Sequence, residues 1–118
     1  QIFEAFGGRE MAASAVSVIA ARVKCIPVLL DGFITTVSAA TLTLFNKNIL
    51  DHCLISHQSS EPGHSGVISH LKKKPILDLN MRLGEGSGAV VASLIIRAAL
   101  TTHNKMSTFS EAGISKKI

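Results

Sequence analysis

The sequence predicts an α/β fold in which a parallel sheet is flanked by helices. Short apolar runs rich in Val, Leu and Ile alternate along the chain with longer Ala- and Val-containing stretches of helical length. The apolar share of 47% and the charged share of 17% indicate a densely buried protein and exclude a disordered one. A length of 118 residues is enough for one domain and hardly for two.

The first half of the chain predicts a helix, a strand, a second helix and a second strand. Residues 8–24 are Ala-rich with charges near both ends, as in a helix packed on most sides. The run PVLLDGF then predicts a buried parallel strand that ends at Asp31 and Gly32. A Thr-containing helix is expected over residues 33–48, and HCLISH at 52–57 predicts the next strand.

The second half predicts a helix, an extended segment and two further helices. In QSSEPGH, Ser59 or Ser60 can cap a helix that has Glu61 and Pro62 in its first turn. The run PILDLNMRL is expected to be extended, and residues 87–103 are expected to be helical. The segment MSTFSEAG predicts a last short helix before a frayed basic tail, ISKKI. We therefore expect a main domain over residues 1–104 and a helix with a tail over 105–118.

Composition also restricts the partners of the protein. A net charge of +4 from mostly dispersed basic residues, with five Phe and neither Tyr nor Trp, argues against nucleic-acid binding and favours a small anionic ligand. No apolar run approaches the roughly 20 residues of a membrane span, so we expect no membrane partner. Cys25 and Cys53 lie in apolar, strand-like runs, which predicts two buried thiols in a reducing compartment rather than a disulfide.

Three short polar segments follow the predicted strands. Ligands of open parallel sheets bind beyond the carboxyl ends of the strands, so Asp31, the segment 56–59 and the segment 84–86 are expected to line one rim. Asp31 is either a turn former or a ligand acceptor. The helix that begins at Ser87 would offer backbone N–H groups to an anion such as phosphate.

Glu85 stands between Gly84 and Gly86 at the start of an apolar helix. The glycines allow a ligand and the backbone to approach closely, and an ionised carboxylate at this position is a proton acceptor. On spacing alone, an ordinary first-turn acidic residue that stabilises a helix fits slightly better. The pattern is not the GxGxxG fingerprint of dinucleotide-binding proteins, so an NAD site is not expected.

Four potential metal ligands, His52, Cys53, His57 and His64, lie close together in the sequence. Their spacing is not that of a zinc site, so we expect no metal. His57 and His64 are then either rim residues that hydrogen-bond a ligand or ordinary surface histidines.

Four segments in order, PVLLDGF, SHQSSEPGH, LDLNMRLGEGSGA and MSTFSEAG, resemble the C-terminal part of the nicotinate-nucleotide–dimethylbenzimidazole phosphoribosyltransferases. The resemblance covers residues 7–113. It implies transfer of phosphoribosyl from nicotinate mononucleotide to 5,6-dimethylbenzimidazole, which yields α-ribazole 5'-phosphate and nicotinate for the lower ligand of cobalamin. It also implies a cytoplasmic enzyme that needs no cofactor and is a homodimer at full length.

The resemblance implies a role for particular residues. Glu85 matches the glutamate of the RLGEG motif, which removes the proton of the benzimidazole as general base. The positions that would contact substrates are Asp31 and Ser59 at the nucleotide, and Leu83, Gly84 and Gly86 at the benzimidazole.

The same resemblance implies that most of the enzyme is missing from this chain. Family members are about three times as long, and their N-terminal portion supplies the rest of a Rossmann-like sheet and much of the benzimidazole pocket. A first residue of Gln1 rather than Met also suggests an excerpt. The alternative to an active enzyme is therefore a truncated, non-catalytic fragment or a ligand-binding remnant, and we expect the chain alone to be inactive.

Overall fold

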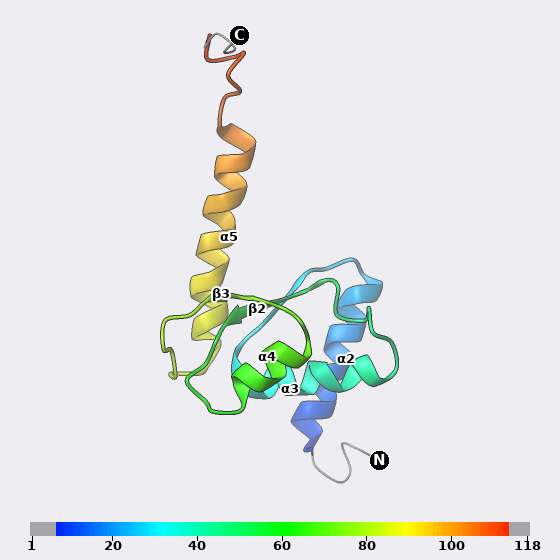
Figure 1. Cartoon of the computed structure of the whole chain (residues 1–118). Helices are drawn as coiled ribbons and strands as arrows, with labels where there is room; N and C mark the ends of the chain where they lie inside the picture. The colour runs from blue at the N-terminus through cyan, green and yellow to red at the C-terminus, as the bar shows by residue number, and fades with distance from the viewer. Residues whose placement is uncertain (1–6, 114–118) are drawn as a thin grey trace.

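The computed structural model describes residues 7–113, which form one parallel sheet with helices packed against it (Figure 1). This architecture confirms the predicted α/β class. The elements in chain order are α2 (Arg9–Val23), β1 (Val28–Leu30), α3 (Gly32–Ala40), the 3₁₀ helix η1 (Thr41–Leu44), β2 (Cys53–His57), α4 (His64–His70), β3 (Pro75–Leu77) and α5 (Ser87–Lys105).

The sheet has the strand order β1-β2-β3 with both pairings parallel. Leu30 at the end of β1 pairs with Ile55 in β2, and His57 at the end of β2 pairs with Leu77 at the end of β3. Because all three strands run in the same direction, the loops that follow them leave from one edge of the sheet. This edge is where the predicted rim forms.

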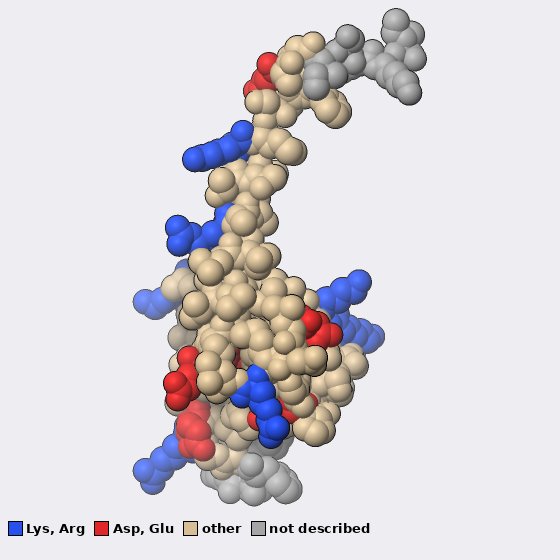
Figure 2. Space-filling view, turned by 90° about the vertical axis from the view of Figure 1, so that its left-hand side faces the viewer, with Lys and Arg blue, Asp and Glu red and all other residues tan. Residues whose placement is uncertain are grey.

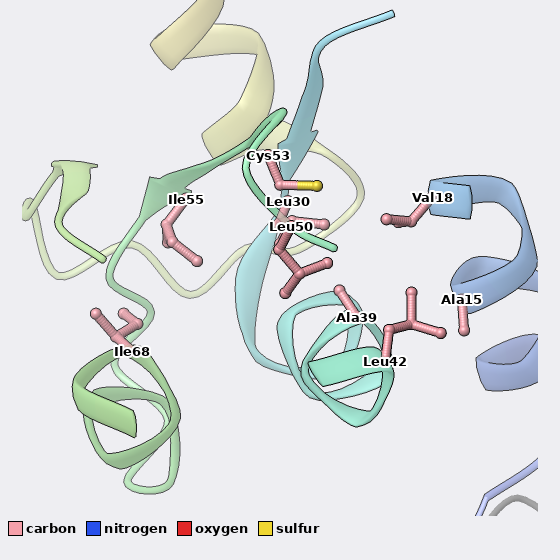
Figure 3. Packing of buried hydrophobic residues seen from close by; sticks show 9 residues of the cluster. All are labelled: Ala15, Val18, Leu30, Ala39, Leu42, Leu50, Cys53, Ile55 and Ile68. Atoms are coloured by element: carbon pink, nitrogen blue, oxygen red, sulfur yellow. The ribbon is translucent and has the colours of Figure 1, made fainter. Parts of the chain in front are cut away.

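The hydrophobic core lies between the sheet and helices α2, α3 and α4 (Figure 3). Ile68 of α4 points toward Ile55 of the central strand, while Val18 approaches from α2. Ile55 is fully buried because β2 has a neighbouring strand on each side and helices against its face. The cluster of buried residues comprises Ala15, Val18, Leu30, Ala39, Leu42, Leu50, Cys53, Ile55 and Ile68.

Helix α2 ends in a Schellman motif, which changes the environment predicted for one cysteine. Cys25 has a positive φ of 55°, its N–H donates to the carbonyl of Arg22, and the N–H of Ile26 donates to the carbonyl of Ala21. Cys25 is therefore part of the helix-ending turn and is exposed, so the prediction that it is buried is wrong. Cys53 is buried as predicted, and both cysteines are free thiols.

Two helices have bounds that differ from the predicted ones. The helix expected over residues 33–48 ends at Ala40 and tightens into η1, where the hydroxyls of Thr41 and Thr43 donate to carbonyls three residues earlier. The helix expected to be capped by Ser59 or Ser60 begins only at His64. Ser59 instead accepts the N–H of Glu61 at 3.3 Å, which stabilises a turn ahead of the helix.

The predicted short helix over 106–113 is a single turn. Thr108 and Glu111 form a capping box, in which the carboxylate of Glu111 accepts the Thr108 N–H at 2.7 Å and the Thr108 hydroxyl accepts the Glu111 N–H at 3.3 Å. Gly113, with φ of 67°, follows at once, so no second turn can form. The basic tail lies outside the described residues, and the boundary predicted at residue 104 stays a prediction.

Helix α5 projects from the body of the molecule (Figure 1). The radius of gyration is 17.8 Å, whereas a compact chain of this length has about 13 Å. Figure 2 shows α5 standing clear of the body with few charged side chains along it. Val90, Leu94 and Leu100 are each more than half exposed, so apolar side chains of α5 lack a cover within residues 7–113. No helix within residues 7–113 is long and apolar enough to cross a membrane.

Replacing Ile55 by Ala tests the central position of β2 in the core. We expect the free energy of unfolding to fall by about 2–5 kcal/mol, because the substitution leaves a cavity between the sheet and α4. The matched control is Ile95→Ala on α5, where the side chain is 50% exposed and the change should stay within about 0.5 kcal/mol. Urea unfolding followed by circular dichroism measures both. Equal losses would contradict the assigned core.

Candidate active site

A cavity of about 400 Å³ opens at the carboxyl edge of the sheet. Its walls come from the loops after β1, β2 and β3, as the rim prediction required. Of the residues predicted to contact substrates or act on them, the structure brings five together there and leaves out Leu83, which is 79% exposed. The lining residues are Asp31, Gly32, Phe33, Ile34, Thr35, His57, Ser59, Glu61, Arg82, Gly84, Glu85 and Gly86.

Glu85 occupies the second position of a tight turn just before α5. Gly84, Glu85 and Gly86 have φ values of 78°, 54° and 78°, and the N–H of Ser87 closes the turn on the carbonyl of Gly84 at 3.0 Å. Positive φ at both central residues is typical of a type I′ turn, and it is rare for a glutamate. The turn holds the exposed carboxylate of Glu85 at the cavity, and its strained backbone marks a candidate functional position.

The two glycines are needed for the backbone conformation of this turn. A Cβ added to Gly84 or Gly86 would have no neighbour within 4 Å. Steric crowding is therefore not the reason for glycine there: positive φ favours glycine, and the space beside both residues is open.

Asp31 connects the end of β1 to the start of α5. Its Oδ1 accepts the backbone N–H of Ala89 at 2.7 Å, so a residue 58 positions earlier caps the helix that follows Glu85. We predicted that the N–H groups at this helix start would bind a phosphate. The structure shows that the Ala89 N–H instead binds a carboxylate of the chain itself, that of Asp31. A carboxylate at a helix N-terminus is also favoured by the helix dipole.

Ser59 is held in place by a buried histidine. The backbone N–H of Ser59 donates to Nδ1 of His64 at 2.9 Å, and Nε2 of His64 lies 3.1 Å from the hydroxyl of Thr36. Because the Thr36 hydroxyl donates to the carbonyl of Gly32 at 2.7 Å, His64 must carry its proton on Nε2 and accept on Nδ1. His64 thus joins helix α3 to the loop after β2 and is neither a surface histidine nor a rim donor.

Burial affects the protonation of this histidine. It lowers the pKa of His64 below the ordinary value of 6.5, and the neighbouring His57 lowers it further, while Glu61 and Asp31 act in the opposite direction. The neutral imidazole matches the hydrogen bonds, since Nδ1 is needed as an acceptor.

The charges around the cavity differ from those of the whole chain. Three acidic residues, Asp31, Glu61 and Glu85, line the cavity together with one basic residue, Arg82. The net charge of +4 predicted a field suited to an anionic ligand, whereas the described cavity wall carries an excess of carboxylates. The site therefore favours a ligand with a positively charged part.

Known proteins with similar sequences point to one family. The sequence model of a protein family described as Phosphoribosyltransferase matches residues 1–114. A relative from Sinorhizobium medicae, named nicotinate-nucleotide–dimethylbenzimidazole phosphoribosyltransferase, is 49% identical over 118 residues, which are 100% of this chain and 35% of the relative. A relative of the same name from Rhizobium johnstonii is 51% identical over 99% of this chain and 35% of its own length.

A solved structure shares the fold. The crystal structure of the Thermus thermophilus enzyme of that name matches with a TM-score of 0.84 and 39% identity, over 94% of this chain and 33% of its own chain. The chain belongs to the nicotinate-nucleotide–dimethylbenzimidazole phosphoribosyltransferase family. It spans about a third of the length of the curated relatives that it matches.

Sequence reasoning missed two residues that support the site in this member of the family. Gly88 is buried against the ring of His57, and Thr36 bonds to His64. Glycine and threonine are common in helices of any kind, so no local signal distinguished these two. Within residues 7–113 no group of three or more His, Cys, Asp or Glu side chains is arranged to hold a metal ion.

Stability below neutral pH tests the buried state of His64. Unfolded His64 takes up a proton near pH 6.5, whereas the folded protein resists protonation. The contribution of neutral His64 to the free energy of unfolding is therefore fully present above pH 6.5. It falls as the pH drops toward the lowered pKa of the folded state, by at most about 1.4 kcal/mol per pH unit. Urea unfolding between pH 8 and 5 should show this slope, and His64→Gln should remove part of it. An unchanged slope in the variant would refute the assignment.

A pair of glycine substitutions tests the strained turn. Gly86→Ala should lower the free energy of unfolding by about 1 kcal/mol, because alanine disfavours φ of 78°. Gly66→Ala, inside α4 and with open space where the new Cβ would lie, should raise the free energy of unfolding by about 0.5–1 kcal/mol. Thermal unfolding of the two variants gives the comparison. Shifts in the same direction would mean that positive φ is not what requires Gly86.

Proposed function

We propose that this chain supplies the general base and part of the nucleotide site of a longer phosphoribosyltransferase. The reaction is transfer of phosphoribosyl from nicotinate mononucleotide to 5,6-dimethylbenzimidazole. The observation that supports it best is that Glu85, Asp31 and Ser59, from three separate loops, line one cavity in a member of this family. The homodimer and the cytoplasmic location of the full-length enzyme stay predictions.

Glu85 has the chemistry that the transfer requires. One nitrogen of dimethylbenzimidazole attacks the anomeric carbon of nicotinate mononucleotide, and the bond from that carbon to the pyridinium nitrogen breaks, with its electron pair passing to nicotinate. The other benzimidazole nitrogen loses its proton to the carboxylate of Glu85, so the ring becomes neutral as the new bond forms. A base that acts in this way contributes about 10²–10⁴ in rate.

The charges and the shape of the cavity support the same substrates. The pyridinium ring and the sugar carbon carry positive charge before and during the transfer, and the carboxylates of Asp31 and Glu61 lie in the same cavity wall. A flat benzimidazole needs room beside the base, which the open space at Gly84 and Gly86 provides. Leu83 is exposed ahead of this turn and becomes a ring contact if the ligand and the rest of the enzyme cover it.

A non-catalytic ligand-binding fragment is the second candidate. It is favoured by the share of the family length that the chain covers and by the exposure of Glu85 and Leu83, which leaves the base without an apolar surrounding. In this case the cavity would bind a nucleotide but not catalyse transfer.

Replacing Glu85 by Gln in a full-length chimera separates the two functions. In the chimera, this chain replaces the matching 118 residues of the Sinorhizobium medicae relative. We expect Glu85→Gln to lower kcat by about 10²–10⁴ with little change in KM, because the amide fills the same space but accepts no proton. Formation of α-ribazole phosphate by chromatography is the readout, with the unmodified chimera as reference.

The matched control is Glu10→Gln, which changes an exposed glutamate in the first turn of α2. It should leave kcat and KM unchanged. Unchanged turnover in the Glu85 variant would remove the base role, and binding of nicotinate mononucleotide by an inactive chimera would favour the ligand-binding fragment.

A further inference from the structure

His57 is a buried titratable residue that has no role in the proposed reaction. It is the last residue of β2, its exposed fraction is 3%, and its Nδ1 lies 3.7 Å from Oδ1 of Asp31. A polar ring buried beside the first turn of α5 is costly unless it makes specific contacts. Its contacts indicate what it does.

Hydrogen bonding assigns the tautomer of His57. The hydroxyl of Ser56 donates its one proton to the carbonyl of Leu30 at 2.9 Å, so toward Nδ1 of His57, 3.2 Å away, it can only accept. Nδ1 therefore carries a proton, and the carboxylate of Asp31 lies on the same side of the ring. Neighbours from β1 and β2 thus fix the orientation of the imidazole.

The first turn of α5 rests on this oriented ring. A Cβ at Gly88 would lie 1.8 Å from Nδ1 and 2.4 Å from Cε1 of His57, so only glycine allows the helix to come this close. The next residue, Ala89, donates its N–H to Asp31. Two consecutive residues of the helix are therefore held by His57 and Asp31.

We propose that His57 is a positioning residue for Glu85: with Asp31, it determines where α5 begins and so where the carboxylate stands in the cavity. This rests on the proposed function, since it requires Glu85 to be the base. Glu85 lies three residues before Gly88, less than one helical turn, and the turn between them is closed by the Ser87 N–H. No flexible link separates the ring from the base.

A matched pair of variants in the full-length chimera tests this role. Asn at position 57 keeps an N–H donor where Nδ1 stands, while Leu has the same size and no donor. His57→Leu should lower kcat about 10- to 100-fold, since small displacements of a reacting group are costly. KM should stay within about twofold, and His57→Asn should recover most of the loss. Exposed His103→Leu on α5 should change neither parameter.

Other outcomes of that experiment overturn the proposal. His57 also lines the cavity, so a hydrogen bond to the substrate is the competing role. A rise in KM with unchanged kcat would assign that role. Equal kcat for the Asn and Leu variants would show that the N–H of His57 does not hold the base.

A pair of compensating substitutions tests the packing of Gly88 against His57 without a measurement of turnover. In the 118-residue chain, Gly88→Ala should remove hydrogen-exchange protection from the amides of Ser87–Val91, because the new methyl group collides with His57. His57→Ala combined with Gly88→Ala should restore it, because the methyl group then enters the vacated space. The same loss of protection with and without His57 would overturn the proposal. An inactive unmodified chimera would instead count against the proposed function alone.

Discussion

Parallel pairing of β1, β2 and β3 is the constraint on which the site depends. Each strand delivers its following loop to the same edge, so residues far apart in the chain meet around one cavity. The register contributes as well, because His57 and Leu77 end their strands side by side. The central strand is held by a core on its helical face, so the packing of Ile55 and Ile68 also sets the position of the loops above it.

Asp31 fixes the start of α5, the helix that follows the candidate base, relative to the sheet. Its carboxylate caps Ala89 and faces His57, so one side chain joins β1, β2 and α5. His64 performs the corresponding function between helix α3 and the loop after β2, through Thr36 and Ser59. Polar contacts of this kind depend on the direction of each donor and acceptor, so a satisfied network fixes the loops more specifically than apolar packing alone.

The candidate base, Glu85, lies in a strained turn of the backbone. Three successive residues with positive φ lie directly before α5, and the middle one is a glutamate, for which this conformation is unfavourable. A surrounding structure that fixes both ends of the turn maintains such strain: Ser87 closes it, and Asp31 caps the helix behind it. Helix α5 is packed near its start, where Gly88 and Ala92 are buried, and projects beyond it with Leu94 and Leu100 exposed.

The sequence by itself determined the α/β class, the order of the elements and the meeting of Asp31, Ser59 and Glu85 at one rim. Apolar periodicity and turn residues are local signals, and a parallel sheet makes the meeting of its loops a consequence of strand order. Only the tertiary structure decided that Asp31 caps α5, that His57 and His64 are buried, and that Gly88 must lack a side chain. These contacts join residues up to 58 positions apart, and a local pattern carries no information about which distant group meets a given side chain. Over the segment 106–113 the sequence predicted a short helix, whereas the structure has a single turn that Gly113 follows with φ of 67°.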